Sequence, residues 1–205
     1  SKLVGLVGGD HSTPYGAVRA VAEHYESFGV LHFDAHRDLR EAYEGFEFSH
    51  ASIMYNLLRD VPQVERLVQV GVRDFCDAEQ ELAEREERVV SFTDRALSHA
   101  RYAGKTWAEQ CAQIVEQLPE QVYISFDIDA LEVQYCPTTG TPVVGGLTFN
   151  EAAYLIWRVV ESGRRIIGFD LVEVAPAQVG HIGEMVGARM LYKLCCATLS
   201  SQTSK

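Results

Sequence analysis

The sequence lacks the features of a disulfide-stabilised, secreted or membrane-spanning protein. Its five cysteines are odd in number and form no Cys-x-x-Cys pair. No apolar run approaches the roughly 18 residues that read as a membrane-spanning helix, and no secretory signal is visible. These absences exclude a disulfide framework and indicate a reducing compartment, so we expect a cytoplasmic protein.

Positive charge is also scarce. The chain has 18 Lys and Arg residues against 29 Asp and Glu residues, which gives a formal net charge of −11. Nucleic acids and anionic membranes offer no counter-charge to such a protein, and we exclude both as partners. Bound cations would offset part of the acidic excess.

The chain does not begin with methionine, and only Ser1 and Lys2 precede an apolar run at residues 3–7. We therefore expect a segment upstream of residue 1. We find no internal repeat, low-complexity tract or linker within residues 1–205. A chain of 205 residues is long enough for one domain that buries roughly 70% of its unfolded surface. The prediction is a single domain.

Strand-like and helix-like segments alternate along the sequence, which implies βαβ units and a parallel sheet. The predicted fold class is α/β, with a doubly wound, mostly parallel sheet in three layers. The predicted strands are residues 3–7, 30–33, 66–71, 89–92, 121–126 and 165–174, the first of them buried. The predicted helices are residues 14–25, 49–59, 77–88, 107–118, 148–161 (capped by Thr148 or Asn150) and 183–199.

Acidic and histidine side chains gather where predicted strands end, which is where open α/β sheets bind ligands. Asp34, His36 and Asp38 follow the apolar run 28–33, and in extended backbone they would point the same way. A buried group of carboxylates is costly without a cation. The candidate metal ligands at these strand ends are His11, Asp34, His36, Asp38, Asp127 and Asp129.

These two imidazoles and four carboxylates exceed what one ion needs, but two ions can share them through bridging carboxylates. The mixed donor set favours Mn²⁺, and Fe²⁺, Ni²⁺, Co²⁺ and Zn²⁺ stay open. Two adjacent ions lower the pKa of a shared water, which indicates metal-assisted hydrolysis. The alternative for residues 34–38 is a hydrogen-bonded polar turn. We expect His32 on the opposite face, packed or touching a ligand rather than binding metal.

Five motifs together resemble the ureohydrolase family, which includes arginase, agmatinase, guanidinobutyrase and formimidoylglutamase. They occur in the family's order and spacing over nearly the whole chain: GGDHS at 8–12, DAHRD at 34–38, SFDIDALE at 125–132, GTPVVGG at 140–146 and EVAP at 173–176. The resemblance implies an arginase-like fold, two Mn²⁺ ions per chain and a homo-oligomer. It also implies hydrolysis of a small guanidino or amidino substrate by a hydroxide that bridges the metals.

The resemblance further implies a role for each site residue. One ion would bind His11, Asp34, Asp38 and Asp127, and the other would bind His36, Asp34, Asp127 and Asp129. The implied catalytic set is Asp38 as a ligand, His50 as proton shuttle and Glu173 facing the guanidinium. As alternatives, His50 would belong to a Ser-His helix cap and Glu173 to a structural salt bridge.

The substrate is predicted from residues 43–50, whose Tyr-Glu-Gly run ending in Ser-His resembles the agmatinase pattern. This favours agmatine over arginine, although Arg37 or Arg40 would be able to hold a carboxylate. Guanidinobutyrase, formimidoylglutamase and arginase activities stay as alternatives, as do a single-zinc deacylase and an inactive homologue. Departures from the family pattern at residues 132–133 and 136–139 bear on substrate range.

Overall fold

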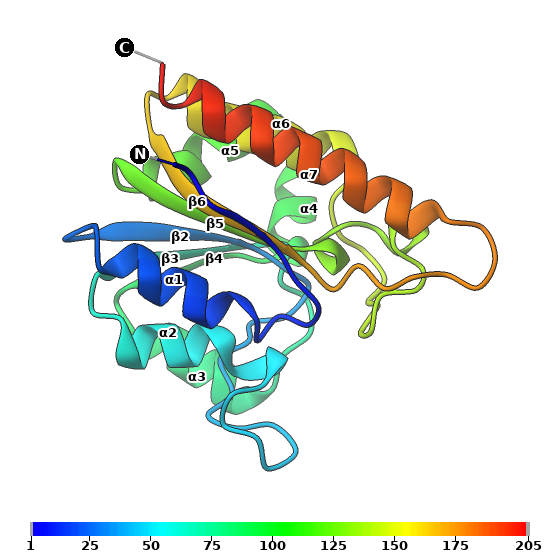
Figure 1. Cartoon of the computed structure of the whole chain (residues 1–205). Helices are drawn as coiled ribbons and strands as arrows, with labels where there is room; N and C mark the ends of the chain where they lie inside the picture. The colour runs from blue at the N-terminus through cyan, green and yellow to red at the C-terminus, as the bar shows by residue number, and fades with distance from the viewer. Residues whose placement is uncertain (1, 204–205) are drawn as a thin grey trace.

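The computed structural model describes residues 2–203 and contains a six-stranded parallel sheet between two layers of helices (Figure 1). The strands are β1 (Gly5–Val7), β2 (Phe28–Phe33), β3 (Val64–Val70), β4 (Val89–Phe92), β5 (Gln121–Asp127) and β6 (Arg165–Val172). The helices are α1 (Pro14–Ala22), α2 (Ile53–Asp60), α3 (Asp77–Arg85), α4 (Asp94–Tyr102), α5 (Trp107–Glu116), α6 (Phe149–Glu161) and α7 (Ile182–Ser200). Three short 3-10 turns are η1 (His50–Ser52), η2 (Ile128–Ala130) and η3 (Val133–Tyr135). The predicted α/β class is confirmed.

The two faces of the sheet carry separate cores. Helices α1, α2 and α3 cover one face, and α4 to α7 cover the other (Figure 1). Strand β2 is buried along its whole length. Phe28 and Val30 pack on the α1 side, whereas Leu31 and Phe33 pack on the α4 side. A parallel strand covered on both faces reads as a continuous apolar run, which is why its pattern was easy to recognise.

The strand order β1-β6-β5-β2-β3-β4 places β2 beside β5. From β2 the chain proceeds outward to β3 and β4, and from β5 it proceeds outward in the opposite direction to β6. The carboxyl ends of β2 and β5 thus flank the point where the winding direction reverses. Open α/β sheets bind ligands in the crevice at such a point, and Asp34 and Asp127 lie there.

One element prediction was wrong, and one helix was missed. The first strand was expected to be buried, but in the described residues β1 lies at the sheet edge beside β6, and Val7 of β1 and the preceding Val4 are 61% and 64% exposed. An apolar run does not reveal whether a strand has neighbours on both sides. Helix α4 was not predicted, because Leu97 is its one buried residue and the helical apolar period is therefore weak.

The two candidate caps of α6 are resolved in favour of Thr148. Its hydroxyl accepts a hydrogen bond from the Glu151 amide, and the Glu151 carboxylate accepts one from the Thr148 amide. This reciprocal pair is a capping box. Among residues 2–203, no helix is both long and apolar enough to cross a membrane.

Candidate metal centre and active site

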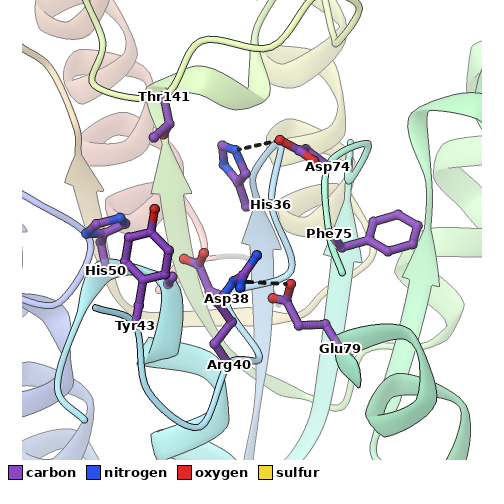
Figure 2. A pocket seen from close by; sticks show the side chains of 10 residues that line it. His36, Asp38, Arg40, Tyr43, His50, Asp74, Phe75, Glu79 and Thr141 are labelled. Atoms are coloured by element: carbon purple, nitrogen blue, oxygen red, sulfur yellow. Dashed lines mark ion pairs between the residues drawn. The ribbon is translucent and has the colours of Figure 1, made fainter. Parts of the chain in front are cut away.

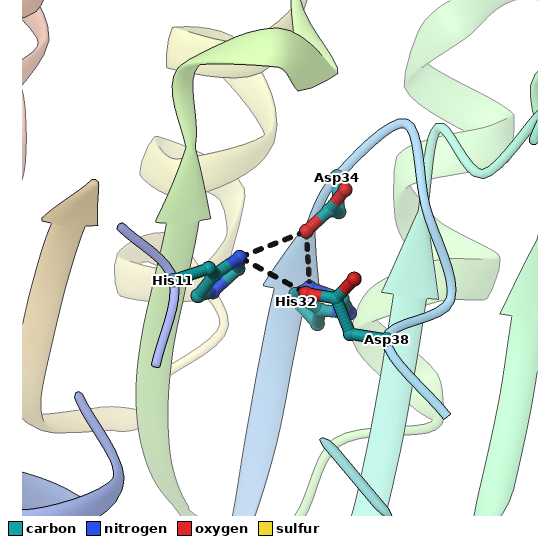
Figure 3. Close-up of side chains that lie close together, drawn as sticks. All are labelled: His11, His32, Asp34 and Asp38. Atoms are coloured by element: carbon teal, nitrogen blue, oxygen red, sulfur yellow. Dashed lines mark hydrogen bonds and ion pairs between the residues drawn. The ribbon is translucent and has the colours of Figure 1, made fainter. Parts of the chain in front are cut away.

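Segments that follow three strands, β1, β2 and β5, bring the predicted ligands together. His11 Nδ1 lies 3.0 Å from Asp34 Oδ2, and 3.2 Å from Oδ2 of both Asp38 and Asp127. Figure 3 shows three of these side chains converging above β2. All four residues are at most 5% exposed. One imidazole nitrogen therefore faces three carboxylate oxygens within a buried space.

A second group adjoins the first through Asp34. His36 Nδ1 lies 3.3 Å from Asp34 Oδ1 and 3.1 Å from Asp129 Oδ2. Asp34 thus presents one oxygen to His11 and the other to His36. Asp127 and Asp129 are linked by the turn η2, in which Asp127 Oδ1 accepts a hydrogen bond from the Asp129 amide. All six predicted ligands lie in these two groups, which share Asp34.

The backbone of residues 34–38 does not follow the predicted extended path. Asp38 has a φ of +55°, in the left-handed region, and the amide of His36 turns back to donate to Asp34 Oδ1. The carbonyl of Ala35 accepts hydrogen bonds from the amides of Arg73 and Asp74. The extended geometry was therefore wrong, and a bent loop held by neighbouring backbone produces the convergence. Positive φ in a non-glycine residue is a strain typical of functional sites.

The hydrogen bonds of Ser125 place the ring proton of His11 on Nε2. Ser125 Oγ donates to Asp170 Oδ1 at 3.0 Å, so it accepts from His11 Nε2, which lies 2.8 Å away. His11 Nδ1 then faces the three carboxylates, and it has no hydrogen-bond partner among the described residues. Four electron-rich atoms facing each other need a positive charge between them. The donor set therefore fits a cation.

The pKa shifts of His11 and Asp127 also indicate that the cluster needs positive charge. Burial lowers the pKa of His11, but close contacts with the carboxylates of Asp127 and Asp34 and the surrounding negative charge raise it well above its ordinary value. Burial raises the pKa of Asp127, and the charges of Asp129 and Asp34 raise it further. The metal-free cluster thus gathers protons, which a metal ion would displace on binding.

The prediction for His32 was wrong in its direction. Its Nε2 lies 2.8 Å from Asp34 Oδ2, so both side chains share one face of the sheet. Residues i and i+2 of a strand point the same way, and the alternation along β2 requires this result. His32 is fully buried and contacts the predicted ligand Asp34. This agrees with the other part of the prediction, that His32 is packed or touches a ligand.

His50 lies on the rim of a cavity of about 150 Å³ beside the cluster (Figure 2). Its ring packs edge-on against that of Tyr43, with the two ring centroids 5.3 Å apart. Ser49 makes no capping hydrogen bond with its side chain, because it bonds Ser52 instead. The helix-cap alternative therefore finds no support. The cavity is lined by His36, Asp38, Arg40, Tyr43, His50, Ala51, Asp74, Phe75, Glu79 and Thr141.

Glu173 follows β6 and does not line this cavity. Its φ is +61°, and its Oε1 accepts a hydrogen bond of 2.8 Å from the His11 amide. Burial raises the pKa of its carboxyl group. It forms no ion pair with any residue in the described part of the chain, which argues against the salt-bridge alternative. Glu173 is instead held next to the loop that carries His11.

The sequence interpretation missed the polar residues that support the cluster from within the sheet. Ser125, Asp170 and Gln69 are each at most 1% exposed, yet they lie inside apolar strands. A polar residue in a strand buried on both faces needs a hydrogen-bond partner. That mismatch was the available signal. It does not name the partner, which depends on strand register.

Comparisons with known proteins agree with the geometry. A family model described as the arginase family matches residues 1–196. An N(1)-aminopropylagmatine ureohydrolase of Thermus thermophilus is 35% identical over 192 residues, covering 93% of this chain and 61% of the relative. An agmatinase of Cronobacter sakazakii is 36% identical over 171 residues, covering 83% of this chain and 51% of the relative.

Among solved structures, proclavaminate amidino hydrolase from Streptomyces clavuligerus superimposes with a TM-score of 0.82 and 28% identity. The match covers 96% of this chain and 64% of that one. A putative agmatinase from Clostridium difficile gives a TM-score of 0.81 and 26% identity, over 97% and 68% of the two chains. The chain spans less than two thirds of the length of the Thermus thermophilus and Cronobacter sakazakii relatives.

Proposed function

This chain belongs to the arginase family, and we propose that it is a binuclear manganese amidinohydrolase that cleaves a guanidino compound, with agmatine favoured, to an amine and urea. The observation that carries the proposal is the environment of His11 Nδ1. This buried nitrogen has no hydrogen-bond partner within residues 2–203 and faces three carboxylate oxygens at 3.0 to 3.2 Å. We further propose a homo-oligomer, as the family resemblance implies, and a cytoplasmic location, as the cysteine pattern indicates.

The proposed ligands divide into two sets that share Asp34 and Asp127. His11 and Asp38 complete one set, and His36 and Asp129 complete the other. The contacts of His11 and His36 with opposite oxygens of Asp34 support this division. Carboxylate and imidazole donors without thiolates favour manganese. When bound, two such ions supply the Lewis acidity that makes a water nucleophilic near neutral pH.

Glu173 would bind the substrate guanidinium. Its carboxylate is half-buried, and the His11 amide fixes one of its oxygens beside the cluster. A fixed carboxylate can accept paired N–H donors from a guanidinium group. His50, on the cavity rim, would carry a proton to the leaving amine, since an imidazole exchanges protons readily near neutral pH.

The charge of the cavity lining favours a cationic substrate tail. Asp38, Asp74 and Glu79 line it, against one arginine, Arg40, whose Nε lies 3.6 Å from Glu79. Arg37 points away into hydrogen bonds with Gln69, Ser91 and Gln80. Arg37 is therefore occupied elsewhere, and the charge of Arg40 is offset by Glu79, so the net negative lining supports an amine such as agmatine over arginine.

The test is a substrate panel with Mn²⁺-loaded protein: agmatine, N1-aminopropylagmatine, arginine, guanidinobutyrate and formimidoylglutamate, with release of urea or formamide measured. We expect urea from agmatine or its aminopropyl derivative at a rate above that from arginine. Hydrolysis of none of the five would refute the proposal. Elemental analysis that finds one Zn²⁺ per chain would favour the deacylase alternative instead.

A further inference from the structure

Buried polar side chains form a row across the sheet directly beneath the cluster. Asp170, Ser125, His32, Gln69 and Ser91 come from β6, β5, β2, β3 and β4, and each is in register with the next. This alignment lets Ser125 bond Asp170, and lets Gln69 bond both His32 and Ser91. His32 is itself part of this row, and Ser125 of the row contacts His11 of the first group.

His32 is close enough to the cluster to count as a ligand. One of its ring nitrogens lies within 4.8 Å of ligand atoms of His11, Asp34 and Asp38. The rings of His11 and His32 are 5.2 Å apart. Proximity alone thus does not distinguish a metal ligand from a residue that binds a ligand. The position of the ring proton does, because a metal binds only a bare nitrogen.

The Gln69 amide has only one orientation that satisfies its neighbours. Gln69 Nε2 lies 2.7 Å from the Arg37 carbonyl, which can only accept. Gln69 Oε1 lies 3.2 Å from Arg37 Nη1, which can only donate. Both contacts require the amide nitrogen to be on the side of His32. That nitrogen lies 3.1 Å from His32 Nδ1, which must therefore accept.

We propose that Gln69 holds His32 as the tautomer protonated on Nε2, so that His32 is a hydrogen-bond donor that positions Asp34 and is not a metal ligand. With Nδ1 accepting from Gln69, the ring proton is on Nε2, 2.8 Å from Asp34 Oδ2. The acceptor at that end is a carboxylate, which fits a donor and opposes a bare nitrogen. Such a bond fixes the orientation of the Asp34 carboxylate, which is the proposed metal ligand.

His11 shows the opposite result from the same row. Ser125 donates its hydroxyl proton to Asp170, so it presents an acceptor to His11 Nε2 and leaves Nδ1 bare towards the carboxylates. An acceptor behind one histidine and a donor behind the other give two neighbouring imidazoles different roles. This inference rests on the proposed metal site, but the position of the His32 proton is testable without metal.

The direct test is ¹⁵N NMR of metal-free protein labelled on histidine. We expect the His32 resonances, assigned by their loss in His32→Gln, to show a protonated Nε2 and a bare Nδ1. A proton on Nδ1 in place of Nε2 would overturn the proposal. Because the measurement needs no bound ion, it separates failure of this inference from failure of the proposed metal-dependent function.

Mn²⁺ titration by calorimetry tests the consequence. His32→Gln keeps an amide donor at the position of Nε2, and we expect near-normal affinity and unchanged stoichiometry. His32→Phe removes the donor but keeps a ring, and we expect affinity to fall about 10- to 100-fold, as for other partners of ligands. The matched change His11→Gln should remove an ion. Loss of an ion in His32→Gln would show that His32 is a ligand. If His32→Phe does not fold, the other variants decide.

Discussion

The proposed metal cluster and the outer part of the cavity beside it, at Asp74, differ in how firmly their side chains are held. Asp34, Asp127 and Asp129 are at most 3% exposed, and neighbouring backbone amides donate to each of them. In the cavity, the Asp74 side chain is 66% exposed, and its ion pair with His36 spans 3.9 Å. Rigid, buried groups suit the reaction chemistry, whereas exposed groups on loops suit substrate choice.

The largest expected effect comes from breaking the cluster at the residue that its two halves share. Asp34→Asn keeps the size of the side chain but removes its charge. Because Asp34 contacts both His11 and His36, both ions should be lost. We expect kcat/KM to fall by more than the roughly 100-fold that loss of a ligand's hydrogen-bond partner causes. Elemental analysis beside urea assays checks this. Retention of two ions per chain would contradict the shared role of Asp34.

Chelation is the next largest perturbation, and it should depend on pH. The pKa of His36 is raised to about 11: burial lowers it, but hydrogen bonds and charges of Asp129 and Asp34 outweigh burial. With an unfolded value near 6.5, the protonated ring stabilises the metal-free fold fully below about pH 6.5, and that stabilisation is lost as pH rises towards 11. Metal bound to the folded state alone adds about 2.7 kcal/mol at 100 times Kd.

The gap in melting temperature between Mn²⁺-loaded and chelated protein should therefore widen between pH 6 and pH 9. Calorimetric melts at four pH values in that window, with matched ionic strength, measure it. The raised pKa of Asp127 acts in the same direction. A chelated protein that melts at the temperature of the loaded one at every pH would show that the six residues form no strong metal site.

The strands and the candidate ligands could be predicted from the sequence, but the contacts that hold the ligands in place could not. Short-range pattern located the strands, and motif spacing nominated all six cluster residues. Yet the extended path through Asp38 was wrong, because the left-handed backbone there depends on contacts with a different loop. The bond between Ser125 and Asp170 joins residues 45 positions apart. Such contacts follow from strand register, which sequence pattern sets only indirectly.

His50 tests the comparison at the boundary between the two regions. His50→Ala should leave metal binding intact, since His50 contacts none of the six ligands through a hydrogen bond or ion pair in the described residues. As a proton carrier, its loss should lower kcat about 100-fold or more. The control is His24→Ala, which changes an exposed histidine and should alter nothing. An unchanged kcat in His50→Ala would remove the shuttle from the mechanism.

Asp74→Asn should give the smallest effect and best isolates the cavity from the cluster. Asp74 lines the cavity but is largely exposed, so solvent screens its attraction for a cationic tail. Exposed ion pairs contribute about 0.2 to 1 kcal/mol, which predicts a KM for agmatine raised only severalfold with kcat retained. Asp77→Asn, an exposed change outside the cavity lining, controls for net charge. A large fall in kcat with normal KM would instead place Asp74 among the groups that organise the cluster, because it contacts His36 rather than only the substrate.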